Sequence, residues 1–191
     1  DCTAQRFALY KPEEILDTLA QHPGQDAAVL YSGDTGFYSG ASGLLTPLRA
    51  LGIPARVYPG VSSIQLLSAA LGRPWQDWKL ASAHGCSCDP VGLGMTHKAV
   101  LFLTGGTETP ASLCRRRSDA GLGNAHATGG EDLGTETEAI RYGSAAELSG
   151  QNFAPLSVLI VENFDLPQFR TPCLPDESFL RGEVPMTKQE V

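Results

Sequence analysis

The sequence lacks any apolar run approaching the roughly 18 residues of a membrane span, and residues 1–6 lack the apolar stretch of a signal peptide. These absences predict no membrane association, and we expect the protein in the cytoplasm. Basic runs are also scarce, because the longest is residues 115–117 in a chain of net charge -7. Nucleic acid is therefore not an expected partner, since phosphate binding needs a cationic surface.

The chain has few cysteines, and their spacing is not that of a disulfide framework. The five are Cys2, Cys86, Cys88, Cys114 and Cys173. An odd number without paired spacing argues against a secreted disulfide scaffold. Cys86 and Cys88, with His84 nearby, resemble half of a zinc site, but no second paired cluster is present. We expect reduced loop thiols and no metal.

Two nucleotide-binding signatures are missing as well. The sequence contains neither a Walker-type Gly-Lys-Ser/Thr turn nor a Gly-x-Gly-x-x-Gly turn, so the usual ATP and dinucleotide motifs are excluded. An apolar fraction of 42% with 18% charged residues is typical of a globular protein rather than a disordered one. A chain of 191 residues holds one large domain or two small ones.

Hydrophobic spacing in the first part predicts alternating helices and strands. The predicted helices are residues 12–19, 38–51 (with Pro47 as a kink or late start) and 64–71, and the predicted strands are residues 27–31 and 55–58. This order implies a mainly parallel sheet. Its two outgoing loops, residues 33–38 and 59–63, then open at one edge, where ligands bind in α/β sheets.

Residues 72–75 combine Gly and Pro and predict a hinge, so we divide the chain into an N-terminal α/β lobe of residues 1–76 and a C-terminal lobe of residues 77–191. In the second lobe the predicted strands are residues 79–82, 100–103 and 157–161, and the predicted helices are residues 110–120 and a short one capped by Ser144. Beyond Phe164 the sequence predicts an irregular tail.

The two loops carry side chains suited to a bound nucleoside. Residues 32–38 supply an acid, hydroxyls and an aromatic pair, residues 59–63 add Ser62 and Ser63, and glycines allow a ligand to approach the backbone. Neither loop contains Lys or Arg, which favours a neutral or cationic nucleoside over a polyphosphate. The alternative is that both turns only connect elements. His84 is a candidate acid or base, or a hydrogen-bonded structural residue.

These residues, taken together, resemble the tetrapyrrole methylase family. Residues 32–39 resemble its Gly-Asp loop in the form found in the branch that methylates C5 of corrinoid precursors, the cobalt-precorrin-7 C5-methyltransferases and the N-terminal part of the precorrin-6Y C5,15-methyltransferases. Further matches follow in the family's order. They are residues 59–63, 72–75, 82–85, 103–106, 120–123, 130–131 and 153–158. The ordered set covers residues 29–162 almost continuously.

The resemblance implies two α/β lobes with S-adenosylmethionine bound in the cleft between them, and methyl transfer to C5 of a corrinoid precursor in cobalamin biosynthesis. The implied cofactor-binding residues are Gly33, Asp34, Thr35, Phe37, Ser62, Ser63, Leu103, Thr104, Gly130 and Glu131. His84 is the implied catalytic residue, as a substrate contact or an aid to loss of the meso proton. Lys79, Lys98, Arg115 and Arg141 are candidates for the substrate carboxylates or for solvated surface charge.

The chain departs from the family pattern at both ends. It lacks the first strand and its Gly-rich loop, so the first lobe is expected to be truncated, while residues 184–191 resemble a junction to a C15-methylating, decarboxylating domain. A homodimer and such a fused or associated domain are the expected partners besides the corrinoid. Alternatives are a methylase acting at C11, C17 or uroporphyrinogen, a non-catalytic tetrapyrrole-binding remnant, and a generic nucleotide-binding α/β domain.

Overall fold

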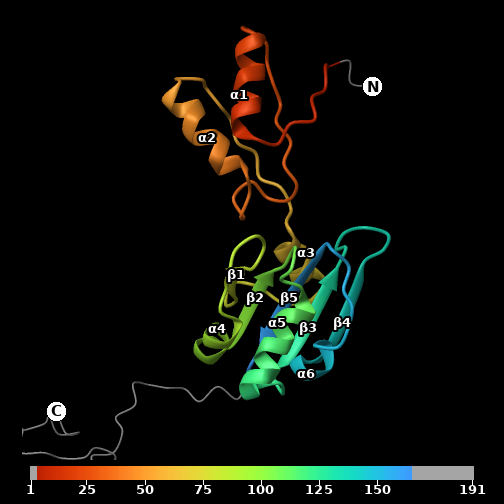
Figure 1. Cartoon of the computed structure of the whole chain (residues 1–191). Coiled ribbons are helices and arrows are strands. Elements are labelled where there is room, and N and C mark those ends of the chain that lie inside the picture. The colour runs from red at the N-terminus through yellow and green to blue at the C-terminus, as the bar shows by residue number, and fades with distance from the viewer. Residues whose placement is uncertain (1–3, 165–191) are drawn as a thin grey trace, which may run out of the picture.

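The computed structural model describes residues 4–164, in which a pair of helices lies at one end of a five-stranded sheet (Figure 1). In chain order the elements are α1 (Pro12–Gln21), α2 (Ala41–Ala50), α3 (Ser63–Leu71), β1 (Lys79–Ser82), α4 (Pro90–Thr96), β2 (Ala99–Leu103), α5 (Pro110–Arg117), the π-helical turn η1 (Ser118–Leu122), β3 (His126–Glu131), β4 (Ala139–Ser144), α6 (Ala145–Leu148) and β5 (Ser157–Glu162). No helix among these residues is long and apolar enough to cross a membrane.

The sheet has the strand order β1-β2-β5-β3-β4. Only β1 and β2 are parallel, whereas β5 runs antiparallel to both β2 and β3, and β3 runs antiparallel to β4. The last strand of the described chain is therefore the middle strand of the sheet, and all of its residues are buried. The strand predicted at residues 157–161 is confirmed, and the structure places it in the middle of the sheet.

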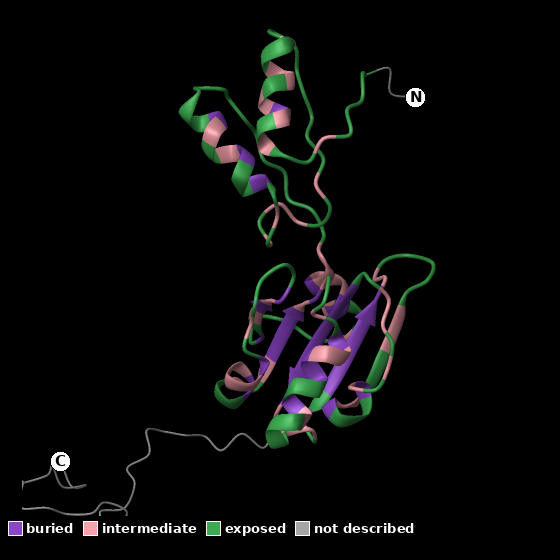
Figure 2. Cartoon of the chain, in the orientation of Figure 1, coloured by how far each residue is buried: buried purple, intermediate pink, exposed green. Residues whose placement is uncertain are grey.

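Alternating side chains of the strands form a separate hydrophobic cluster on each face of the sheet, as expected from the period of two along a strand. On one face Phe102 packs in a cluster with Leu113 of α5 and Leu148 of α6. On the other face Leu101 packs in a cluster with Leu67 of α3. The sheet is thus the middle of three layers, and Figure 2 shows its inner strands β2, β5 and β3 as the main buried part of the molecule.

Short sequence signals begin and end the helices. The Asp89 carboxylate accepts hydrogen bonds from two backbone N–H groups in the first turn of α4, and Thr109 and Ser144 cap α5 and α6 in the same way. Gly72 follows α3 in the left-handed conformation, with a φ of 61°, which glycine adopts at low cost. Caps of this kind, as at Ser144 and Gly72, mark helix ends by local residue types.

Most predicted elements are confirmed, and the mixed α/β class is confirmed with them. The helix expected at residues 38–51 begins later, at Ala41, with Pro47 inside it. The sequence analysis did not predict α4, β3 or β4. The expected tail beyond Phe164 lies outside the described residues. The division at residues 76 and 77 stays a prediction, and α3, which precedes it, packs on the sheet that follows it.

Two predicted strands and the mainly parallel sheet were wrong. Residues 27–31 and 55–58 are not strands in the structure, and the sheet is mainly antiparallel. A strand needs a neighbour to satisfy its N–H and C=O groups. Within residues 4–164 neither segment forms a backbone hydrogen bond to the other, and the Leu30 side chain is 92% exposed. The first part is held instead by a small core around Ile15, Leu44 and Leu48.

A buried leucine and an exposed leucine give a test of this architecture. Leu101 is fully buried in β2, so we expect Leu101→Ala to lower the free energy of unfolding by about 2–5 kcal/mol through lost burial and a residual cavity. The matched change Leu30→Ala should alter it by less than about 0.5 kcal/mol. Urea unfolding followed by fluorescence of the buried Trp78 measures both. Equal losses from the two variants would contradict the assignment of the core.

Candidate functional site

The two glycine-containing bends predicted to form the site lie side by side. The Thr35 hydroxyl donates a hydrogen bond to the Tyr58 carbonyl at 2.9 Å. Gly60 is so close to the other bend that a Cβ placed on it would lie 2.3 Å from the Gly33 carbonyl oxygen. Only glycine allows this approach without displacing backbone. Their predicted proximity is confirmed, although no sheet edge produces it.

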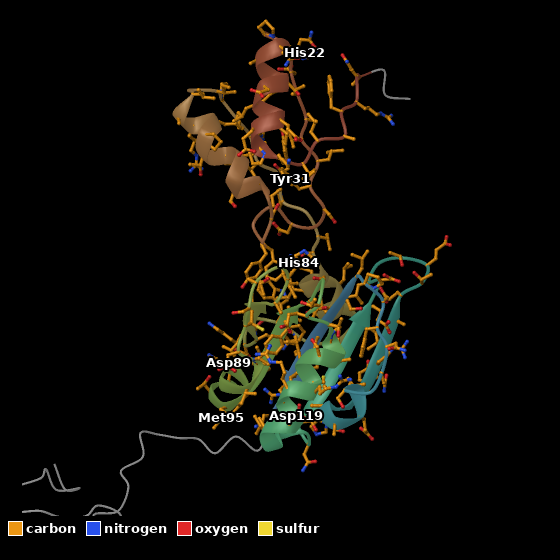
Figure 3. All side chains as sticks on the ribbon, in the orientation of Figure 1. His22, Tyr31, His84, Asp89, Met95 and Asp119 are labelled. Carbon is orange, nitrogen blue, oxygen red and sulfur yellow. The ribbon has the colours of Figure 1, made fainter. Side chains whose placement is uncertain are left out.

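A cleft of about 630 Å³ opens between these bends and one end of the sheet. Its volume is typical of pockets for small organic ligands. Figure 3 shows His84 at the end of the sheet that faces α1 and α2, whereas Asp119 and Met95 lie toward the opposite end. The residues that line the cleft are Ser32, Tyr38, Val61, Ser62, Ser63, Leu66, Ser82, His84, Cys86, Leu103, Thr104, Gly130, Asp132, Leu133, Pro155, Leu156 and Ser157.

Strand pairing brings the sheet side of this cleft together. Ser82 ends β1 opposite Leu103, which ends β2. Val158, near the start of β5, lies opposite both Leu103 and Gly130. Because β5 runs antiparallel to its neighbours, its first residues are level with their last ones. Residues that are up to 75 positions apart in the sequence, Ser82 and Ser157, therefore line one cleft.

Six of the residues predicted for the site line the cleft, namely His84, Ser62, Ser63, Leu103, Thr104 and Gly130. The other predicted residues of the first bend do not line the cleft, and they stabilise the shape of the bend instead. The Asp34 carboxylate accepts a hydrogen bond from the Gly36 N–H at 2.7 Å, and Phe37 packs against the apolar cluster that contains Leu101. Their neighbours Ser32 and Tyr38 are the lining residues of that bend.

Glu131 lies inside the sheet rather than in the cleft lining. It is 4% exposed, and its carboxylate accepts hydrogen bonds from the Arg141 guanidinium and from the Ala154 N–H. Both oxygens are therefore occupied by partners from other parts of the chain. The carboxylate is satisfied without a ligand.

The His84 ring is held in one orientation. Its Nδ1 lies 3.2 Å from the Thr104 carbonyl oxygen, and Gly105 leaves room for the ring, because a Cβ there would lie 1.9 Å from Nδ1. A carbonyl oxygen only accepts hydrogen bonds, so in the neutral ring Nδ1 carries the proton and donates it. The other nitrogen, Nε2, is then an unprotonated acceptor. His84 is exposed, so this nitrogen is accessible to a ligand.

The described lining contains one carboxylate, Asp132, and no lysine or arginine. The candidate basic residues lie elsewhere. Arg115 donates to the Ser149 carbonyl, Arg141 pairs with Glu131, and neither Lys79 nor Lys98 lines the cleft. Fixed cations that would hold a polyphosphate are thus missing from the lining. A neutral or cationic ligand fits these surroundings better.

Several lining residues were not predicted from the sequence. Tyr38 and Asp132 adjoin predicted positions, and both adopt a left-handed backbone, with φ of 48° and 47°, which is uncommon for residues other than glycine. No sequence signal reveals that conformation. Pro155, Leu156 and Ser157 belong to a segment that the family resemblance included, yet no role was assigned to them. Among the described residues, no group of three His, Cys, Asp or Glu side chains is placed to bind a metal.

Among the cysteines that the structure describes, an exposed thiol and a buried thiol give a test of the cleft. Cys86 lines it and is exposed, whereas Cys114 is buried, and burial raises the pKa of its thiol to about 12. The thiolate is the reactive form, so at pH 8 we expect iodoacetamide to modify Cys86 at least about a hundredfold faster than Cys114. Peptide mass spectrometry resolves the two sites. Comparable rates in the folded protein would contradict the described burial.

The comparisons with known proteins identify the family. The family model described as Tetrapyrrole (Corrin/Porphyrin) Methylases matches residues 4–149. The chain is 32% identical over 130 residues to cobalt-precorrin-7 C(5)-methyltransferase of Salmonella typhimurium, which covers 67% of this chain and 62% of that protein. It is also 32% identical over 140 residues to the decarboxylating precorrin-6Y C(5,15)-methyltransferase of Sinorhizobium sp., covering 73% of this chain and 33% of that protein.

Solved structures share the fold. Cobalt precorrin-4 methyltransferase superposes with a TM-score of 0.67 at 14% identity, over 84% of this chain and 72% of that one. The Thermus thermophilus uroporphyrin-III C-methyltransferase, complexed with S-adenosylhomocysteine, gives 0.63 at 17% identity, over 79% and 68%. The chain spans less than two thirds of the length of the first curated relatives it matches. With residues 4–149 matched by the family model, the chain belongs to the tetrapyrrole methylases.

Proposed function

We propose that this chain binds S-adenosylmethionine in the cleft and takes part in methyl transfer to a corrinoid precursor in cobalamin biosynthesis, at C5 of the macrocycle. The observation that carries the proposal is the cleft itself, in which two hydroxyl-bearing bends face the strand ends without any lysine or arginine in the lining. The names of two relatives, both C5-methylating enzymes, support the choice of carbon.

The residues present fit the methyl donor. Its sulfonium and ammonium groups are cationic, and the lining offers the Asp132 carboxylate and no opposing cation. Ser62 and Ser63 place hydroxyls beside the bend at Gly33, while Leu103 and Gly130 supply strand-end backbone. A cleft of about 630 Å³ suits a nucleoside of this size.

When bound, the donor supplies an electrophilic methyl group with its own leaving group, so the chain's task is mainly to align reactants. The predicted donor residues of the first bend, Gly33, Asp34, Thr35 and Phe37, would act by holding the bend in shape. Thr104 would act similarly, because its hydroxyl donates to the Ser157 carbonyl at 2.6 Å and fixes two walls of the cleft.

His84 is the proposed proton acceptor. A meso carbon that gains a methyl group must lose its proton, and Nε2 of His84 is the unprotonated nitrogen of a ring fixed through Nδ1. No other side chain of the described lining offers an imidazole nitrogen, or another such acceptor, in so fixed an orientation.

The finer expectations remain predictions. These are the homodimer, the fused or associated C15-methylating domain, and the cytoplasmic location. The choice between C5 and C11, C17 or uroporphyrinogen methylation is decided by identifying the methylated product. Whether the chain is a non-catalytic remnant is decided by whether it binds the donor at all.

Calorimetric titration with S-adenosylhomocysteine tests the proposal. We expect saturable binding that ATP does not displace, because the lining has no cation for phosphates. Gly60→Ala should weaken binding about 5- to 150-fold, because its Cβ would force the Gly33 bend away and overpacking of this kind costs about 1–3 kcal/mol. Gly150→Ala, which meets no atom within 4 Å, is the matched control and should bind normally. Absent binding, or displacement by ATP, would refute the methylase site.

The role of His84 has its own test. His84→Asn retains an amide N–H for the Thr104 carbonyl but removes the basic nitrogen, so we expect kcat to fall about 10²- to 10⁴-fold with donor affinity within twofold of the parent's. His97→Asn changes a histidine outside the described lining and should keep full activity. Turnover is measured by transfer of a labelled methyl group to the corrinoid. Unchanged kcat in His84→Asn would remove His84 from the chemistry.

A further inference from the structure

Residues 153–157, here called the wall segment, form one side of the cleft through Pro155, Leu156 and Ser157. This segment precedes β5 and has no helix or strand of its own before Ser157. Its position therefore depends on contacts to other parts of the chain. Leu156 is 75% exposed, so burial of that side chain does not hold the segment in place.

Two hydrogen bonds link the wall segment to the end of β3, in addition to the Thr104–Ser157 hydrogen bond and the packing of Phe153 against the cluster of Phe102. The Ala154 N–H donates to the Glu131 carboxylate at 2.6 Å, and the Asp132 N–H donates to the Leu156 carbonyl at 2.8 Å. The Arg141 guanidinium, from the neighbouring strand β4, binds the other Glu131 oxygen and lies 5.6 Å from the centre of the Phe153 ring. One buried carboxylate thus joins β3, β4 and the wall segment.

The burial of Glu131 makes this arrangement sensitive to its charge. A carboxylate that is 4% exposed must be paired, because an unpaired buried charge is strongly unfavourable. Its two partners are one guanidinium and one wall-segment N–H. Hydrogen bonds to a charged group are stronger than those between neutral groups. Removing the charge therefore weakens the attachment of the wall segment directly.

A second ion pair of similar burial, in which Arg73 occupies both oxygens of Glu162, provides a comparison within the molecule. Arg73 binds Glu162 with side-chain exposures of 44% and 7%, against 44% and 5% for Arg141 and Glu131. Glu162 ends β5, at the opposite end of that strand from Ser157, and lies outside the cleft lining. The two pairs are alike in burial and differ in what they adjoin. Of the two, only the Arg141–Glu131 pair contacts a segment of the cleft, through Ala154.

We propose that Glu131 is a positioning residue for the cleft, whose buried carboxylate holds the wall segment and thereby sets the affinity for the ligand. This inference rests on the proposed function for the identity of that ligand. Glu131 acts through Ala154 and Arg141 and does not itself line the cleft. The Arg73–Glu162 pair stabilises the sheet without affecting ligand affinity.

Hydrogen exchange on the full chain, measured without any ligand, tests whether Glu131 holds the wall segment. In Glu131→Gln, which keeps the side-chain volume and removes the charge, the amides of Phe153, Ala154, Leu156 and Ser157 should exchange about tenfold faster. In Glu162→Gln the same amides should exchange as in the parent. Unchanged exchange in Glu131→Gln, or equal acceleration in both variants, would overturn the proposal. If Glu131→Gln does not fold, the exposed Arg141→Gln takes its place with the same expected direction.

Calorimetry with S-adenosylhomocysteine tests the functional part. We expect the Kd to rise about tenfold in Glu131→Gln and to stay within twofold in Glu162→Gln, while both variants lower Tm by similar amounts. A purely structural role for Glu131 would lower Tm and leave Kd unchanged, which would overturn the proposal. A parent chain that binds no S-adenosylhomocysteine would refute the proposed function instead, and the exchange experiment would still decide whether Glu131 holds the wall segment.

Discussion

The pairing of β5 with both β2 and β3 is the constraint on which the cleft depends. β5 is inserted between strands that precede it by many residues, and each of its six residues is buried. Because it runs antiparallel to both neighbours, its first residues are level with the ends of β2 and β3. Thr104, Gly130 and Ser157 meet at that level. Without this strand the sheet would divide, and the lining residues would not be neighbours.

At the same end of the sheet, the paired charges of Glu131 and Arg141 lie apart from the surface that faces the ligand. The Glu131 carboxylate and the Arg141 guanidinium neutralise each other beside the cleft, which leaves hydroxyls, backbone groups and one carboxylate in the lining. Such surroundings favour a ligand that brings its own positive charge. The fold therefore places its ion pairs where they hold segments of the chain. The bends at Gly33 and Gly60 meet the ligand through small residues, because only these allow close approach.

Much of this protein was predictable because the signals were local. The helix cap at Ser144 is set by that residue and Glu147, three positions later, and apolar runs such as β2 need no knowledge of their partners. β3 escaped prediction because its sequence, His-Ala-Thr-Gly-Gly-Glu, contains few residues with strand preference. It becomes a strand because β4 and β5 flank it. Residues 27–31 show the reverse case, an apolar run that has no strand partner among residues 4–164.

The sequence alone determined the family, most of the helices other than α4, and the two glycine-containing bends, since these depend on residue types at fixed short spacings. The tertiary structure decided that the sheet is mainly antiparallel and that the second bend lies against the first. It also decided that the Glu131 carboxylate serves Arg141 and Ala154 rather than the cleft lining. These features depend on strand neighbours and on which buried charges find partners. Both are properties of long-range contacts, which residue spacing along the chain does not encode.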